Sequence, residues 1–200
     1  MKFAEIAEFF ERMEVTSKRL ELTEILVELL KNRPINVISK VTYLIQGKLR
    51  PNFEGVELGI AERLAMKAIS KSAGVSMKKI EDSYKVGGDL GVTAANILKQ
   101  KTQTTFSAES ITLERVYDTL FKIAKLEGKG SQDMKIKYIS SLLNDATTNE
   151  SKFILKILLG TLRLGIAENT LMDALAIAVS YTHLRAHETR HDLVCRLLLE

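Results

Sequence analysis

The sequence predicts an all-α protein, on three observations. Apolar residues recur at intervals of three and four along most of the chain, which is the spacing of one helical face. Leu, Ile, Ala, Lys and Glu, which favour helices, are abundant, whereas the 200 residues include only 2 prolines. The polar, β-branched segment 102–107 is the one stretch that favours an extended or linker conformation.

The first helices are marked by the residues that end them. Helices are expected over residues 3–13, 20–30, 37–46 and 56–73. Pro34 follows the second helix, and Gly47 stops the third. Gly74 can close the fourth in a left-handed conformation.

The later helices are marked by the residues that begin them. One is expected to begin at Ser76 and to end at the glycines of positions 87, 88 and 91. Others are expected over residues 112–126, 131–143, 153–159 and 168–178. Thr112 and Ser131 are predicted caps, and Thr147 with Glu150 has the spacing of a capping box.

One motif occurs twice. Gly47-Lys48-Leu49-Arg50 corresponds to Gly160-Thr161-Leu162-Arg163 at an interval of 113 residues. Gly59-Ile60-Ala61-Glu62 recurs as Gly165-Ile166-Ala167-Glu168, so the first copy carries seven extra residues between its two parts. This long period predicts two similar helical halves about an approximate twofold axis, each with the same glycine-rich basic turn.

These turns have the chemistry of phosphate binding. Glycine allows close backbone approach, the next helix offers N–H groups at its N-terminus, and arginine adds a bidentate cation. The segment 128–137 repeats the pattern, with two glycines, Ser131 and two lysines. Two equivalent phosphate contacts would suit a nucleic-acid duplex bound without regard to sequence.

Composition and the absence of certain motifs limit the classes of protein to which this chain can belong. A net charge of +4 allows a polyanionic partner without requiring one, and a single cysteine excludes an intrachain disulfide. No apolar run approaches the roughly 18 residues of a membrane span, and no secretory signal begins the chain, so the cytoplasm is expected. P-loop and nucleophile-elbow motifs are absent, and no catalytic residue is assigned. Most Phe and Tyr residues occupy apolar-stripe positions and are expected in the core, and not as platforms on which bases stack.

Several blocks together resemble the N-terminal DNA-binding domain of archaeal and eukaryotic ATP-dependent DNA ligases. The blocks are Tyr43 to Leu49, Gly59-Ile60-Ala61-Glu62, Gly88-Asp89-Leu90-Gly91, Gly130-Ser131 ahead of Lys135-Ile136-Lys137, and Leu162-Arg163-Leu164-Gly165. The resemblance covers residues 1–178. It implies an all-helical, monomeric domain that grips nicked duplex DNA across the minor groove in replication, repair and recombination, near the nucleoid.

The resemblance also implies which residues face DNA. They are Gly47, Lys48, Arg50, Gly128, Gly130, Ser131, Lys135, Gly160, Thr161, Arg163 and Gly165. Family members form a lysine–AMP adduct at a Lys-x-Asp-Gly motif, which this sequence lacks. ATP and Mg²⁺ are therefore expected in the nucleotidyltransferase and OB-fold domains of a parent enzyme, and this chain should bind DNA without ligating it. A helical scaffold for a protein partner is the alternative.

The last 22 residues differ from the rest. His183, His187, His191 and Cys195 are spaced by four and would form one face of a helix, so a metal site is a second alternative. Residues 179–188 and 193–199, however, resemble translated sequencing-adapter DNA. Residues 179–200 are therefore expected to be a non-native tail with no metal and no functional role.

Overall fold

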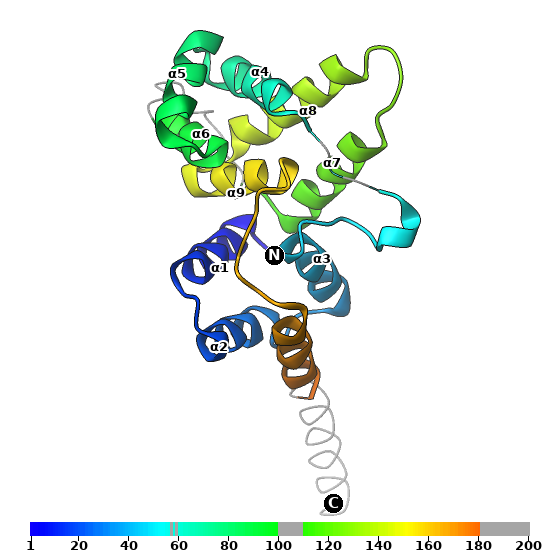
Figure 1. Ribbon diagram of the computed structural model, residues 1–200. Helices are drawn as coiled ribbons and strands as arrows, with labels where there is room; N and C mark the ends of the chain where they lie inside the picture. Colours follow the sequence, from blue (N-terminus) through cyan, green and yellow to red (C-terminus); the bar gives the residue numbers. More distant parts are fainter. Residues whose placement is uncertain (57, 59, 100–109, 181–200) are drawn as a thin grey trace, which may run out of the picture. The chain divides into compact units, whose positions relative to one another are not determined.

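The computed structural model describes residues 1–56, 58, 60–99 and 110–180 (Figure 1). These residues form helices joined by turns, and the one β-type contact among them is an isolated bridge between Lys2 and Thr112. The all-α prediction is confirmed for this part of the chain. The helices are α1 (Phe3–Val15), α2 (Arg19–Leu30), α3 (Ile35–Ile45), η1 (Asn52–Glu54), α4 (Glu62–Ala73), α5 (Met77–Gly87), α6 (Leu90–Lys99), α7 (Leu113–Lys125), α8 (Ser131–Asp145), α9 (Thr148–Leu158) and a last one over residues 168–180.

The chain divides into two compact units. The first combines Met1–Phe10 with Ser39–Leu162, and the second combines Glu11–Ile38 with the chain from Arg163 onward. Neither unit corresponds to one half of the sequence. The expected twofold relation between two halves therefore stays a prediction.

The first unit is built from paired helices around a buried aromatic contact. Helix α6 packs along α9, and α4 packs along α8 (Figure 1). The rings of Phe10 and Phe153, both fully buried, meet edge to face with their centroids 5.5 Å apart. The start of the chain is fixed by backbone hydrogen bonds, from Phe3 N to Ile111 O (2.8 Å) and from Leu113 N to Met1 O (2.9 Å).

The second unit includes α2 and the helix over residues 168–180. Leu22, Leu26 and Leu29 of α2 are buried, as is Leu171 of the helix over residues 168–180. An ion pair of 2.7 Å joins Arg19 in α2 to Asp173 in that last helix. The apolar spacing of α2 in the sequence therefore matches its buried face.

The predicted caps are mostly confirmed. The side chains of Ser76 and Thr112 accept hydrogen bonds from the third amide of α5 and α7, and Thr147 forms its capping box with Glu150. Gly74 closes α4 at φ +69°. At α8 the prediction is wrong by one residue, because Gly130 is the N-cap at φ +87° and Ser131 is already helical.

Helix α6 was missed by the sequence prediction. Asp89 caps it, since one carboxylate oxygen accepts the amides of Gly91 (2.7 Å) and Val92 (3.1 Å). Gly91 does not end a helix as expected but lies in the first turn of α6. A Cβ added there would lie 2.8 Å from the carbonyl oxygen of Lys152, so this glycine allows α6 and α9 to approach closely.

Helix α4 begins six residues later than predicted. Val56, Leu58 and Ile60 recur at every second residue, which is the spacing of extended chain and not of a helix. Ala61 has extended backbone angles as the N-cap of α4. The segment 102–107, predicted to be extended, lies outside the described residues.

Candidate nucleic-acid interface

The first of the repeated turns closes α3 with a left-handed glycine. Gly47 has φ +67°, its amide donates to Leu44 O (2.9 Å), and the amide of Lys48 donates to Tyr43 O (2.9 Å). These two bonds form the helix-ending motif in which a left-handed residue lets two successive amides reach back to the last turn.

The second repeated turn has the same geometry at the end of α9. Gly160 has φ +65°, its amide donates to Ile157 O (3.1 Å), and the amide of Thr161 donates to Lys156 O (2.9 Å). Each donor and acceptor lies 113 residues after its counterpart. The repeat found in the sequence is therefore a repeat of backbone structure at these two turns.

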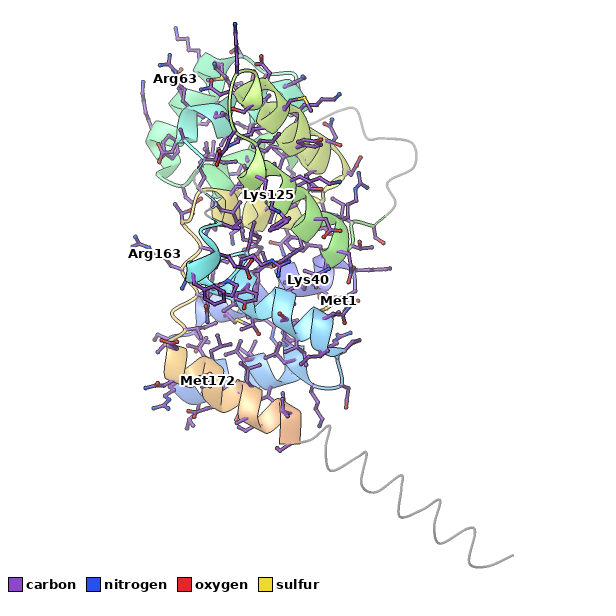
Figure 2. The ribbon with its side chains drawn as sticks, turned by 90° about the vertical axis from the view of Figure 1, so that its right-hand side faces the viewer. Met1, Lys40, Arg63, Lys125, Arg163 and Met172 are labelled. Carbon is purple, nitrogen blue, oxygen red and sulfur yellow. The ribbon has the colours of Figure 1, made fainter. Side chains whose placement is uncertain are left out.

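Side chains alternate in the same way in both turns. Leu49 is fully buried and Leu162 nearly so, whereas Lys48 and Arg50 in the first turn and Thr161 in the second are exposed. The leucine anchors each turn and leaves its polar neighbours in water. In the second unit, Arg163 is exposed and extends away from the ribbon (Figure 2), and Gly165 has φ +66°.

The third predicted turn joins α7 to α8. Gly128 and Gly130 have φ +85° and +87°, and Ser131 donates its amide to Gly128 O (3.2 Å). Lys129 is exposed, and Lys135 is half-buried on the second turn of α8. Two left-handed glycines here are consistent with the predicted close approach of backbone to a ligand.

The structure brings the first and third turns to the same end of α7. The Arg50 guanidinium lies 5.3 Å from the centroid of the Phe121 ring, and the Lys125 ammonium lies 4.4 Å from it. Lys125 is the last residue of α7, three positions before Gly128. Both turns lie in the first unit, whereas Arg163 and Gly165 belong to the second.

Sequence reasoning missed two cations on this face. The Lys40 ammonium lies 5.3 Å from the centroid of the Tyr117 ring, one helical turn along α7 from Phe121. Figure 2 shows Lys40 and Lys125 on the same side of the first unit. We call Lys40, Arg50 and Lys125 the α7 cation cluster; the spacing of Tyr117, Phe121 and Lys125 by four was the available signal.

The first turn is fixed from beneath by Tyr117. The buried Tyr117 hydroxyl donates a hydrogen bond to the carbonyl oxygen of Leu49. Burial raises the pKa of Tyr117 and outweighs the opposing effect of the positive Arg50, so the hydroxyl keeps the proton that it donates. Arg50 Nε also lies 3.9 Å from a carboxylate oxygen of Glu54.

The second turn is fixed by an ion pair. Lys156, whose carbonyl accepts the Thr161 amide, is 9% exposed and places its ammonium 3.1 Å from Asp89 Oδ2. Burial opposes ionisation of Asp89, but hydrogen bonds from the Val92 amide and Lys156 outweigh it, and the net effect is to lower the pKa. Asp89 therefore caps α6 and holds α9 with one carboxylate.

The described residues contain neither a membrane-spanning helix nor a metal-binding cluster of side chains. Among the described residues, no helix combines the length and apolar character needed to cross a bilayer. The same part of the chain holds no group of three or more His, Cys, Asp or Glu side chains placed to bind a metal ion. His183, His187, His191 and Cys195 lie outside it.

Comparison with known proteins identifies the family. The model of the family described as "DNA ligase N terminus" matches residues 2–176. The chain is 70% identical to a DNA ligase of Nitrosopumilus maritimus over 90% of its length, and 63% identical to one of Cenarchaeum symbiosum over 89%. It spans 31% and 30% of the lengths of these two relatives. The chain therefore belongs to the family of DNA ligase N-terminal domains.

Proposed function

We propose that this chain is the part of an ATP-dependent DNA ligase that binds nicked duplex DNA through its phosphates and minor groove. The observation that carries the proposal is the pair of turns after α3 and α9, which repeat one backbone geometry and expose polar side chains. A duplex presents two phosphate backbones of the same kind, so a repeated contact suits it.

The α7 cation cluster strengthens the proposal. Lys40, Arg50 and Lys125 are held along one helix by aromatic rings. Their side chains are therefore partly ordered before a ligand arrives, which lowers the entropy lost on binding. Cations that neutralise phosphates release condensed counterions, and this release drives binding without reading the base sequence.

The chemistry of ligation belongs elsewhere in the parent enzyme. This sequence contains no Lys-x-Asp-Gly motif at which an adenylate could be attached. ATP and Mg²⁺ would supply adenylation in a nucleotidyltransferase domain, with an OB-fold domain completing the grip. The residues of this chain bind and position the duplex for those domains during replication, repair and recombination, as a monomer associated with the nucleoid.

Salt dependence of binding tests the proposal. A fluorescein-labelled nicked duplex is titrated with the chain at several salt concentrations, and anisotropy gives Kd. We expect log K to fall steeply with log salt, and Arg50→Ala, Lys135→Ala or Arg163→Ala to reduce the slope by about one unit each. Lys71→Ala, an exposed lysine of α4, is the control and should leave the slope unchanged. A flat salt dependence would favour a scaffold for a protein partner.

The tail is proposed to have no part in this function. A chain ending at Ala178 should bind the nicked duplex with the affinity of the full chain, because every proposed contact lies before that point. Zn²⁺ titration of both chains tests whether the histidines of the tail bind metal. If the full chain bound one Zn²⁺ and the shorter chain lost both Zn²⁺ and DNA binding, the metal-site alternative would be supported and this view contradicted.

A further inference from the structure

Phe53 is an aromatic residue that the fold leaves in water. It is 88% exposed, in the middle of η1, whereas Phe3, Phe10 and Phe153 are fully buried. Phe53 is therefore an exception to the expected burial of most Phe and Tyr residues. Single exposed apolar residues are common in proteins, so exposure alone assigns no role to Phe53.

The backbone that carries Phe53 is a closed turn that follows a fixed residue. Leu49, before the turn, is buried and its carbonyl is bound by the Tyr117 hydroxyl, while Arg50 lies against the Phe121 ring. Within the turn, the Glu54 amide donates to Pro51 O at 3.0 Å and closes η1 around Phe53. A turn held in this way presents its ring with little further loss of backbone entropy on binding.

The η1 turn, which we call the tip, lies among the extra residues that the first copy of the motif has and the second copy lacks. In the second copy, one residue separates Arg163 from Gly165, whereas residues 51–58 separate Arg50 from Gly59 in the first. The seven extra residues of the first copy fall in this segment, which contains Phe53. An apolar tip therefore accompanies the first basic turn and has no counterpart beside the second.

We propose that Phe53 enters the minor groove of bound DNA and packs against deoxyribose, so that the first turn favours DNA over RNA duplexes. The inference rests on the proposed function, because Arg50 and its neighbours would hold the phosphates that flank the tip. The minor groove of B-form DNA is narrow, about 6 Å, and its walls are sugar faces that apolar side chains can contact. An RNA duplex has a wide, shallow minor groove that displays 2′-hydroxyls, which would leave the ring without an apolar surface to cover.

Binding to matched DNA and RNA duplexes tests this role. Kd is measured by anisotropy for a DNA duplex and an RNA duplex of the same sequence, with the full chain and with Phe53→Ala. We expect the substitution to weaken DNA binding about tenfold, the effect of losing one buried apolar contact, and RNA binding less than about twofold. Selectivity for DNA should fall accordingly, while the salt slope stays unchanged because no charge is lost.

Val86→Ala is the matched control. Val86 is 91% exposed on α5, so its truncation also removes an exposed apolar group from the first unit. It should leave both affinities unchanged. Equal losses on DNA and RNA, or no loss on either, would overturn the role of Phe53 while leaving the proposed function intact. An unmodified chain that binds neither duplex in a salt-dependent way would overturn both.

Discussion

The turn after α3 and the turn after α9 follow the same backbone path, but different interactions support them. A neutral hydrogen bond from Tyr117 to the Leu49 carbonyl holds the first. An ion pair between Lys156 and Asp89 holds the base of the second. Both turns have the left-handed glycine with its two amide bonds, whereas the packing beneath them differs.

The interactions that support the two turns also differ in their dependence on pH. A hydroxyl with a raised pKa keeps its proton throughout the neutral and acid range, so the support of the first turn does not depend on pH there. The support of the second depends on an ionised carboxylate.

Replacing Asp89 should have the largest effect. Asp89→Ala removes a carboxylate from beside the buried Lys156 ammonium and also removes the cap of α6, and we expect a loss of about 3 kcal/mol in the free energy of unfolding. Urea unfolding measures it. Asp82→Ala is the control, because Asp82 pairs with Lys85 at 3.9 Å on the surface and should cost less than about 0.5 kcal/mol. Similar losses from both would show that the ion pair does not support α9.

Removing the Tyr117 hydroxyl should have the next largest effect. Tyr117→Phe keeps the ring but leaves the buried Leu49 carbonyl without its donor, at a cost of about 1.5 kcal/mol in unfolding free energy. Tyr84→Phe provides a matched control, since its hydroxyl donates to Glu62 (2.8 Å) at the surface. A Tyr117→Phe protein as stable as the unmodified chain would mean that the first turn is held by its own backbone bonds alone.

The two glycines should be equally sensitive. Gly47→Ala and Gly160→Ala each place a Cβ on a left-handed residue with open space around it, so strain alone decides the cost, about 1 kcal/mol each. Thermal unfolding gives both values. Gly87→Ala serves as the reference because Gly87 lacks a positive φ and should be nearly neutral. Unequal losses of unfolding free energy for Gly47→Ala and Gly160→Ala would show that the two turns are not equivalent.

Acid should affect the second turn selectively, with the smallest effect. The folded pKa of Asp89 is lowered, so its contribution to stability is complete above the unfolded value of about 4 and is lost as pH falls through the folded pKa. Asp89→Asn should therefore lose less stability between pH 5 and 3 than the unmodified chain, by urea unfolding. A steeper acid loss in the variant would contradict the assignment.

Most of the fold could be read from the sequence because helical spacing and caps act locally. The stripes of α1 and α2, and the caps at Ser76, Thr112 and Thr147, depend on residues within one or two turns. Helix α6 was missed because Gly91 is favourable only in view of the Lys152 carbonyl, 61 residues later in the sequence. Helix α4 begins later than predicted because Val56, Leu58 and Ile60 have the two-residue spacing of extended chain ahead of the Ala61 N-cap.

The sequence predicted the glycine-rich turns of the candidate site, but not the side chains that the fold places beside them. Left-handed glycines and basic residues leave a sequence signal, and Gly47, Gly128, Gly130 and Gly160 all have the positive φ that such turns use. In the α7 cation cluster, spacing within α7 could indicate only Lys125, because Lys40 and Arg50 contact rings more than 60 residues away in the sequence. The exposure of Phe53 likewise depends on how the η1 turn is held.

The pairing of the first residues with the segment before α7 has a consequence for synthesis on the ribosome. Phe3 N donates to Ile111 O, and the Phe10 ring meets that of Phe153, so residues 3 and 10 are covered by residues that are translated more than a hundred codons later. Contacts so distant in sequence slow folding and leave apolar surface uncovered in the meantime. The apolar stripe of α1 must therefore wait in an unfinished nascent chain until α9 has been made.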